Sequence, residues 1–304
     1  MALSACGSAS IDGQGREQVE HGTTLFPVAC YYDNISEEAV SWHWHDELEV
    51  LLIEAGIARV SANGTDCIVR QGEGIFINAG ILHGVWPKGN GPCRLRSVVF
   101  HPRLVGGSVD SILWQKYVEP LLSDPCRPWV CLSSSQEWEQ AALEAIQGAW
   151  QAGVSETEGF EFTVREQLSR LIFLLAKRCP GTEKTPSEKA LRDGNRIKPM
   201  LQYIQEHYGE ELTLAKIAGS AAVSKTECLR CFHTMVGSTP IQYVKQVRVQ
   251  KAAELLASTD RKISDIGSAC GFQEMSYFSK IFRELKGCTP QQFRKRGPRF
   301  IDVP

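Results

Sequence analysis

Two patterns of hydrophobic positions divide the chain. Short β-branched or aromatic runs, broken by Gly and Asn, fill residues 25 to 101 and predict strands. Ala62-Asn63-Gly64 lies between two of these runs, and Asn-Gly tolerates the positive φ angles of a tight hairpin turn. Many short strands at regular spacing are typical of a β-sandwich or barrel. Beyond them, apolar residues at helical spacing predict helices near residues 109–122, 136–151 and 156–178.

The pattern changes at Cys179–Asn195, a segment rich in Pro, Gly and charged residues that we interpret as a linker. From Arg196 onward the periodicity is helical almost throughout. We therefore predict a two-domain α+β chain. It would have a β-barrel with attached helices over residues 1–178, a linker over 179–195 and an all-α domain over 196–304.

The last hundred residues contain an internal repeat with a period of 50. Five residues of the first copy recur in the second: Phe232, Gly237, Thr239, Pro240 and Gln242 return as Phe282, Gly287, Thr289, Pro290 and Gln292. Each Thr-Pro pair predicts the start of a helix, because Thr caps the free amides and Pro suits the first helical position. Two copies are too few for a solenoid, so the repeat indicates two copies of one supersecondary unit.

Each copy has the pattern of a short helix, a turn and a second helix. In the first copy the helices are Leu214–Ala222 and Lys225–Val236; in the second, Gly271-Phe272 forms the turn before Glu274–Lys286. This is the pattern of a helix-turn-helix, whose second helix can enter the major groove of DNA. The amphipathic stretch Ile241–Ser258 predicts one long helix that joins the copies.

Helical periodicity separates an apolar face from a polar face in each second helix. In the second copy the apolar positions are Met275, Phe278, Ile281, Phe282 and Leu285, and the opposite face carries Ser276, Ser279, Lys280 and Arg283. The same positions in the first copy expose Thr226, Leu229, Arg230 and His233. Arg230 and Lys280 therefore occupy equivalent places, and Arg can bind guanine through two hydrogen bonds. The alternative to DNA contact is that these polar positions form an ordinary solvated helix face.

Cys228 and Cys231 fall on the apolar face, so we expect buried packing there rather than metal or redox chemistry.

Charge is distributed unevenly between the two ends. The net charge is -2, yet residues 196–304 hold 17 Lys and Arg against 10 Asp and Glu, whereas residues 1–195 hold 16 against 25. A basic module fused to an acidic one is typical of nucleic-acid binding confined to one end.

A hydrophobic content of 43% excludes a disordered chain, and no apolar run reaches the length of about 18 residues that a membrane span needs. The first twenty residues show no secretory signal, so we expect a cytoplasmic protein whose 11 cysteines are reduced thiols.

The C-terminal part of the sequence resembles a known family. Residues 196–297 resemble the tandem helix-turn-helix domain of the AraC/XylS family of transcription regulators, and the stretch ISDIGSACGFQEMSYFSKIFRELKGCTPQQFRK (263–295) follows the family signature closely. The resemblance implies that each second helix enters one of two successive major-groove segments. It also implies a set of DNA-contacting residues: Lys225, Thr226, Leu229 and Arg230 in the first copy, and Gln273, Ser276, Ser279 and Lys280 in the second.

The N-terminal domain carries a cluster of possible metal ligands. His43-x-His45-x3-Glu49-x6-Gly56 resembles the first motif of cupin barrels, and Gly80-x2-His83 resembles part of the second. On a strand His43 and His45 point the same way, so two imidazoles converge inside a barrel. With Glu49 and His83 they could form a three-histidine, one-carboxylate site for iron, zinc, nickel or manganese. Two alternatives stay open: a pocket that binds a polar effector without metal, and a purely structural network.

The tryptophans of this domain are expected on different faces. Trp42 and Trp44 alternate with the histidines, so we expect them to face away from the pocket and to pack against the helices at 109–178. Trp86 lies near His83 in sequence and is the aromatic residue that we expect to stack on an effector.

We predict a ligand-responsive transcriptional regulator that is not an enzyme. Its cupin-like sensor domain would bind a small-molecule effector through His43, His45, Glu49, His83 and Trp86, and the attached helices would form a homodimer. Its partners would be double-stranded promoter DNA and RNA polymerase, with no membrane and no required cofactor. A metal-dependent cupin enzyme, an isomerase or oxygenase with an incidental basic tail, is the competing hypothesis. A metal-sensing regulator that uses His43, His45, Glu49 and His83 is a third.

Overall fold

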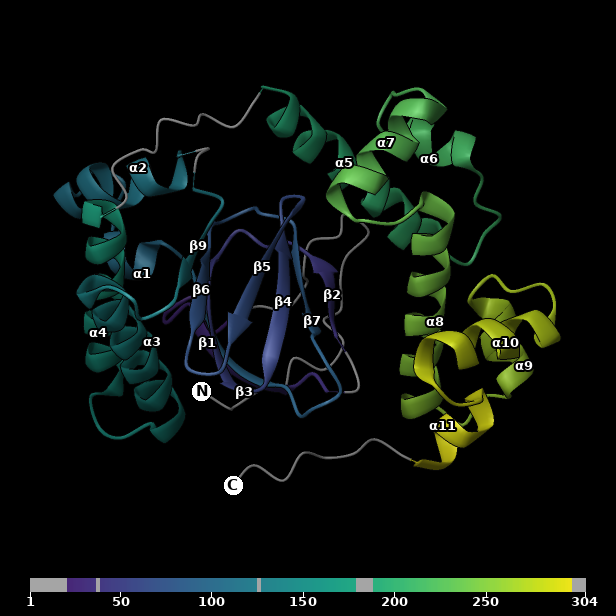
Figure 1. Cartoon of the computed structure of the whole chain (residues 1–304), viewed down its shortest axis with the longest axis horizontal. Helices are drawn as coiled ribbons and strands as arrows, with labels where there is room; N and C mark the ends of the chain where they lie inside the picture. Colours follow the sequence, from purple (N-terminus) through teal and green to yellow (C-terminus); the bar gives the residue numbers. More distant parts are fainter. Residues whose placement is uncertain (1–20, 37–38, 125–126, 179–187, 297–304) are drawn as a thin grey trace. The chain divides into compact units, whose positions relative to one another are not determined.

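The chain divides into two compact units, with the division between Gly194 and Asn195. The computed structural model describes residues 21–36, 39–124, 127–178 and 188–296 (Figure 1). We call the described residues up to Gly194 the β unit and those from Asn195 onward the helical unit. In these described ranges no helix is long and apolar enough to cross a membrane.

The β unit is built on two antiparallel sheets (Figure 1). The five-stranded sheet has the order β1-β8-β3-β6-β9, with strands Val28–Asn34, Arg94–Phe100, Leu48–Ala55, Gly74–Ile77 and Trp129–Leu132. The four-stranded sheet has the order β2-β7-β4-β5, with strands Val40–His43, His83–Pro87, Ile57–Ala62 and Thr65–Arg70. The predicted hairpin turn joins β4 to β5, and both Asn63 and Gly64 have positive φ angles, of 49° and 78°.

Side chains on the two faces of β3 contribute to two different apolar cores. Leu48 and Val50 belong to a core that the five-stranded sheet shares with the helices. Leu51 and Ile53, on the other face of the same strand, belong to a core with residues of β4, β5 and β7 in the other sheet. Because β3 is apolar on both faces, it lies between two packed layers.

Helices cover one face of the five-stranded sheet (Figure 1). The short turns α1, η1 and α2 are followed by two long helices: α1 spans Arg103–Gly106, η1 Trp114–Val118, α2 Glu119–Leu122, α3 Glu137–Ser155 and α4 Phe160–Arg178. The pair α3–α4 contributes Leu143, Ile146, Leu168 and Leu171 to the core beneath the sheet. Strand β9 lies between these helices in the sequence and was not predicted, because four residues are too few to show alternation.

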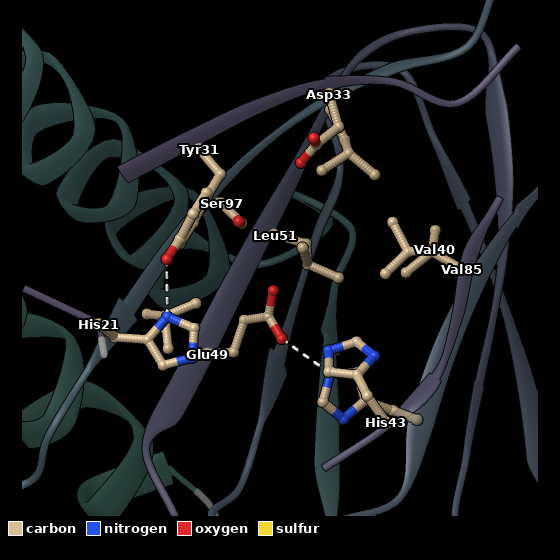
Figure 2. Close-up of a pocket in the computed structure, with 12 residues that line it drawn as sticks. His21, Tyr31, Asp33, Val40, His43, Glu49, Leu51, Val85 and Ser97 are labelled. Carbon is tan, nitrogen blue, oxygen red and sulfur yellow. Dashed lines mark hydrogen bonds and ion pairs between the residues drawn. The ribbon is translucent and has the colours of Figure 1, made fainter. Parts of the chain in front are cut away.

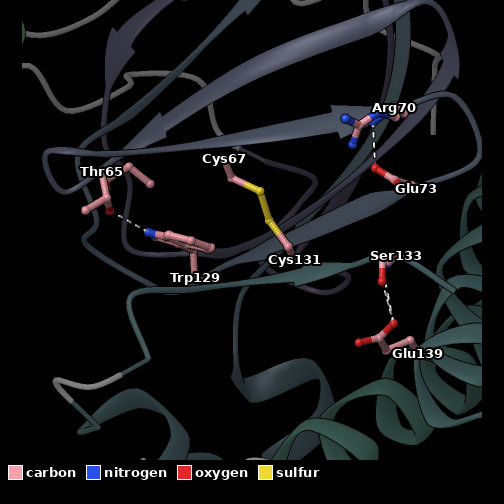
Figure 3. The surroundings of a disulfide bond; sticks show 9 residues. Thr65, Cys67, Arg70, Glu73, Trp129, Cys131, Ser133 and Glu139 are labelled. Atoms are coloured by element: carbon pink, nitrogen blue, oxygen red, sulfur yellow. Dashed lines mark hydrogen bonds between the residues drawn. A yellow bond between two sulfur atoms is a disulfide. The ribbon is translucent and has the colours of Figure 1, made fainter. Parts of the chain in front are cut away.

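A disulfide joins the edge strands of the two sheets (Figure 3). Cys67 of β5 is bonded to Cys131 of β9, and the indole Nε1 of Trp129 donates a hydrogen bond to Thr65 Oγ1 at 3.1 Å beside it. Our expectation that all cysteines are reduced thiols is therefore wrong for this pair. Without β9, the sequence pattern could not place Cys131 opposite Cys67.

The helical unit contains two pairs of helices around a longer one. The helix α5 Glu188–His207 crosses the division at Asn195, and the helices that follow are α6 Leu214–Ser220, α7 Lys225–Met235, α8 Pro240–Ser258, α9 Ile263–Ala269, α10 Met275–Lys286 and α11 Pro290–Arg296. The pairs α6–α7 and α9–α10 both pack against α8 (Figure 1). Gly271 turns the chain between α9 and α10 with a φ of 80°, and a Cβ there would lie 2.5 Å from the carbonyl oxygen of Tyr208.

The predicted linker is partly helical. Residues 179–187 lie outside the described residues, whereas residues 188–195 form the first two turns of α5. The Pro and Gly residues that suggested a linker lie mostly before Glu188, and the stretch that follows is rich in helix-favouring Glu, Lys, Ala, Leu and Arg.

The 50-residue repeat corresponds to repeated helix caps. The side chain of Thr239 accepts a hydrogen bond from the backbone N–H of Gln242, and Thr289 accepts the equivalent bond from Gln292. At the end of α10, Gly287 has the left-handed conformation with a φ of 70°. The residues that repeat in sequence are therefore largely those that start and stop helices.

Candidate functional site

Three histidines and one glutamate meet between the two sheets of the β unit, and Figure 2 shows two of them, His43 and Glu49. His43 at the end of β2 is paired directly with His83 at the start of β7, whereas Glu49 comes from β3 in the other sheet. His45 follows β2. Each of the four residues is at most 6% exposed, and their potential ligand atoms all lie within 4.8 Å of one another.

Local backbone geometry brings these side chains together. Glu49 shares the inner face of β3 with Leu51, because side chains alternate along a strand. In β2 the register shifts between Val40 and His43, so both residues line the same cavity although they are three positions apart. The ring centroids of His43 and His83 lie 4.1 Å apart across the strand pair.

Backbone carbonyl groups fix the orientation of every imidazole. Each ring uses its Nδ1 atom to hydrogen-bond a carbonyl oxygen two residues away: His43 with Ser41 at 2.8 Å, His45 with Glu47 at 3.1 Å and His83 with Ile81 at 2.8 Å. A carbonyl oxygen only accepts, so each Nδ1 carries the hydrogen. The Nε2 atoms of His83 and His45 then lie 2.8 Å and 3.3 Å from Glu49 Oε2.

Glu49 is a carboxylate held in its charged form. Burial alone would raise its pKa, but hydrogen bonds from His45 and His83 and the charges of these rings outweigh burial and hold the pKa of Glu49 well below 4.5. The stabilisation from this carboxylate is therefore complete above its ordinary pKa and is lost as the pH falls toward the lowered value.

The cavity beside the cluster is small and partly polar. Its volume is about 10 Å³. Besides His43, Glu49 and His83 it is lined by four buried polar residues that the sequence analysis missed, namely His21, Tyr31, Asp33 and Ser97 (Figure 2). His21 Nδ1 and the Tyr31 hydroxyl are joined by a hydrogen bond of 2.8 Å. Polar residues at inward positions of β1 and β8 were the signal that could have revealed this lining.

The tryptophans lie elsewhere. Trp86 follows Val85, which lines the cavity, so it points to the other face of β7 and does not line the cavity with His83. It packs instead against Trp42, with ring centroids 5.0 Å apart, and under the guanidinium group of Arg59. Our expectations that Trp86 stacks on an effector and that Trp42 packs against the helices are therefore wrong, because both tryptophans pack on each other.

A second set of predicted site residues lies on α7 and α10. The apolar face is buried in both helices, including Cys228, Phe232, Phe278 and Phe282, although Leu285 is 45% exposed and lies off the core. The opposite faces expose Lys225, Thr226 and Leu229 on α7, and Gln273, Ser276 and Lys280 before and along α10. Arg230 and Ser279 are half-buried. Cys228 and Cys231 are fully buried, and burial raises the pKa of the Cys228 thiol to about 11.

The equivalent cations of the two helices have different surroundings. Arg230 donates to Glu227 through Nε at 2.9 Å and Nη2 at 2.7 Å, and Arg196 of α5 donates to the same carboxylate at 2.6 Å. Lys280 is exposed and forms no ion pair with the residues that the structure describes. Arg230 is therefore restrained by an ion pair on α7, whereas the side chain of Lys280 on α10 is exposed to solvent.

Comparisons with known proteins match the two units to two different domain families. The AraC-like ligand binding domain family matches residues 25–161, and the helix-turn-helix domain family matches residues 217–296. YdeC of Bacillus subtilis, named as an uncharacterized HTH-type transcriptional regulator, is 31% identical over 288 residues, which are 94% of this chain and 97% of YdeC. The chain belongs to the AraC family of transcriptional regulators.

Two further proteins match this chain over a similar length. RhaS of Klebsiella pneumoniae, an HTH-type transcriptional activator, is 24% identical over 90% of this chain and 96% of its own. A crystal structure of ToxT from Vibrio cholerae is 10% identical over 90% of this chain and 99% of that chain, with a TM-score of 0.45. This AraC-family chain is thus a ligand-responsive, DNA-binding regulator of transcription, and the competing hypothesis of a metal-dependent enzyme is not supported.

Proposed function

We propose that this AraC-family regulator binds promoter DNA through two helix-turn-helix units. The pairs α6–α7 and α9–α10 would be the two units, and α7 and α10 would enter successive segments of the major groove. The internal repeat, the exposed polar faces of both second helices and the excess of 17 basic over 10 acidic residues in 196–304 support this reading. Lys225, Thr226, Leu229, Arg230, Gln273, Ser276, Ser279 and Lys280 are the proposed contact residues.

The effector would bind in the β unit, which we interpret as a cupin-like barrel. The observation that carries this proposal is that His43, Glu49 and His83 line one buried cavity, with His45 Nε2 lying 3.3 Å from Glu49 Oε2 beside it. Polar groups that converge in a mostly apolar cavity are typical of ligand sites, because they fix the orientation of what binds. Trp86 is excluded from the site by its position on the other face of β7.

The helices of the β unit would form a homodimer. Phe162 and Phe173 on α4 are 80% and 46% exposed, and eleven residues of helix place them on nearly the same face. Large exposed apolar side chains of this kind are typical of protein interfaces. The dimer would place two DNA-binding units on a promoter in the cytoplasm, where RNA polymerase is the partner that responds. Replacing Phe162 with Glu should convert a dimer to a monomer in sedimentation analysis.

The proposed effector site can be tested on the full chain. In vitro selection would first define a preferred DNA site, and a thermal-shift screen would identify ligands that favour the native state. His45→Ala and Glu49→Ala should abolish the effect of such a ligand on DNA binding while leaving ligand-free DNA binding within a few fold. His207→Ala, which removes a half-buried histidine of α5, is the control. A normal response in the first two variants would place the effector site elsewhere.

A further inference from the structure

We propose that Arg196 of α5 is a positioning residue for the reading of DNA by α7, and that it acts through Glu227 to set how readily Arg230 reaches a base. The proposed contact residues belong to α7, to α10 and to the turn before α10, so this inference adds a residue of a third helix. It rests on the proposed function, because it requires α7 to enter the major groove.

One carboxylate of α7 binds two arginines. Glu227 Oε1 accepts a hydrogen bond from Arg196 Nη1 at 2.6 Å and one from Arg230 Nη2 at 2.7 Å, while Glu227 Oε2 accepts from Arg230 Nε at 2.9 Å. Arg196 lies 31 residues before Glu227 in the sequence, whereas Arg230 lies about one helical turn after it. The carboxylate is therefore shared between a cation of the contact helix and a cation of α5.

Glu227 lies where a negative charge would oppose DNA binding. It is in the first turn of α7, between the proposed contact residues Thr226 and Arg230. In a complex with DNA, the phosphate groups would repel a carboxylate at this place. Arg196 supplies the compensating charge from outside α7. The side chains of Arg196 and Glu227 are 38% and 27% exposed, so salt screens this pair less than it would screen fully exposed charges.

The shared oxygen atom gives Arg196 two effects of the same sign. Before DNA binds, Arg196 competes with Arg230 for Oε1, so Glu227 holds Arg230 less tightly than it would without Arg196. After Arg230 turns toward a guanine, Arg196 still neutralises Glu227, so no uncompensated carboxylate remains beside the phosphates. Loss of Arg196 should therefore weaken binding to the DNA sites that Arg230 reads.

The internal repeat places a comparable contact in the second copy. Tyr277 is the third residue of α10, as Glu227 is of α7, and Nζ of Lys245 on α8 lies 5.6 Å from the centroid of the Tyr277 ring. In both copies a cation of the long helix, α5 or α8, thus contacts the third residue of the contact helix. That residue is a carboxylate only in the first copy. Arg196 can therefore change the hold on Arg230, whereas Lys245 has no such influence on Lys280.

The first experiment is a double-mutant cycle on the full chain, with affinity for the selected DNA measured by fluorescence anisotropy. Arg196→Gln removes the charge, and it should weaken binding roughly three- to fivefold, the effect expected of one partly exposed ion pair. In the Glu227→Gln background the same change should have an effect of less than about twofold, because the coupling is already lost. Arg196→Lys keeps the charge and should bind within about twofold of the wild type. Arg192→Gln removes an exposed arginine of α5 one turn earlier, and it measures the general effect of one positive charge.

A positioning role also predicts where sequence preference changes. The selected DNA site would be varied one base pair at a time. Arg230→Ala should remove discrimination at the base pair that Arg230 reads, and Arg196→Gln should reduce discrimination at that same base pair and at no other. A side chain that only held α5 against α7 would lower the melting temperature without this selective loss. Circular dichroism melting of every variant measures that structural effect separately.

The outcomes distinguish this inference from the proposed function. Equal weakening by Arg196→Gln in the wild-type and Glu227→Gln backgrounds would mean that Arg196 contacts phosphate itself, and it would overturn the inference. An effect no larger than that of Arg192→Gln would overturn it as well. In both cases a selective loss in Arg230→Ala would leave the proposed function intact. If Arg230→Ala changes neither affinity nor discrimination, the proposed reading of DNA by Arg230 fails and the positioning role of Arg196 fails with it.

Discussion

The two units of the chain differ in whether their charged side chains are buried or exposed. Among the described residues, nearly all buried polar and charged side chains, including His43, Asp33, Glu49 and Glu139, lie in the β unit before α5, and the exception is Asp193 of α5. The helical unit carries the basic excess on exposed helix faces. Buried charges act at short range in a low dielectric, whereas exposed cations act over a distance that salt controls. The β unit is therefore suited to select one ligand by contact, and the helical unit to approach a long polyanion.

Salt should reveal the largest difference between the units. If the helical unit makes six phosphate contacts, the logarithm of its DNA affinity should fall with a slope of about -5, or roughly 10³-fold between 50 and 200 mM salt. Fluorescence anisotropy with the full chain would measure the slope. Ligand binding in the β unit should change little over the same range. A slope near zero would contradict the assignment of DNA binding to exposed cations.

Reduction of the disulfide should affect the β unit alone. The bond closes a loop between residues 64 positions apart, and loss of such a cross-link destabilises by roughly 2–4 kcal/mol because the unfolded chain gains freedom. All 7 tryptophans lie before residue 151, so tryptophan fluorescence reports on the β unit. Urea unfolding followed in this way should shift to lower urea with a thiol reductant.

A Cys67→Ser, Cys131→Ser double variant is the control for this shift. It should unfold like the reduced wild type and should not respond to the reductant. An unchanged unfolding midpoint in the reduced wild type would show that the cross-link contributes nothing to the β unit. A matching shift in DNA affinity would show that the two units are less independent than their charge distributions suggest.

The two units also differed in how far the sequence predicted them. In the helical unit the period of 3.6, the Thr-Pro caps at Thr239 and Thr289 and the terminal Gly287 are local signals, and the helices begin and end close to where these signals lie. The 50-residue repeat strengthened each signal, because the same capping residues occur at equivalent positions of both copies.

In the β unit the important contacts join residues far apart in sequence. The spacing of His43 and His45 predicted two rings close together, and their centroids lie 5.7 Å apart, yet nothing local indicated the register shift in β2 or the pairing of β9 with β6. The position of Trp86 was wrong because nearness to His83 in sequence was given more weight than alternation along β7. Strand contacts depend on register, and register is fixed by the whole sheet.

Within the helical unit, α7 and α10 repeat the same fold with different restraint. Replacing Lys280 or Arg230 with Ala should each cost roughly 1–3 kcal/mol at the selected DNA site if the side chain binds guanine, and far less on random DNA. We expect Lys280→Ala to have the larger effect, because Arg230 must first leave part of its bond with Glu227. Equal weakening on both DNAs would instead assign these side chains to phosphate contacts.

Glu227→Gln should produce the smallest change and the sharpest comparison. The side chains of Glu227 and Arg230 are 27% and 30% exposed, so their ion pair contributes no more than about 1 kcal/mol to folding. Loss of the negative charge should weaken the hold of residue 227 on Arg230 and Arg196, raise affinity for the selected DNA several-fold and steepen the salt dependence. Glu284→Gln removes an exposed acidic group from α10 without freeing an arginine that the structure pairs with it, so it measures the general effect of charge. A larger gain in Glu227→Gln than in Glu284→Gln would show that the ion pair restrains Arg230. Equal gains would mean that α7 and α10 present their cations to DNA alike, and the contrast drawn between them would be wrong.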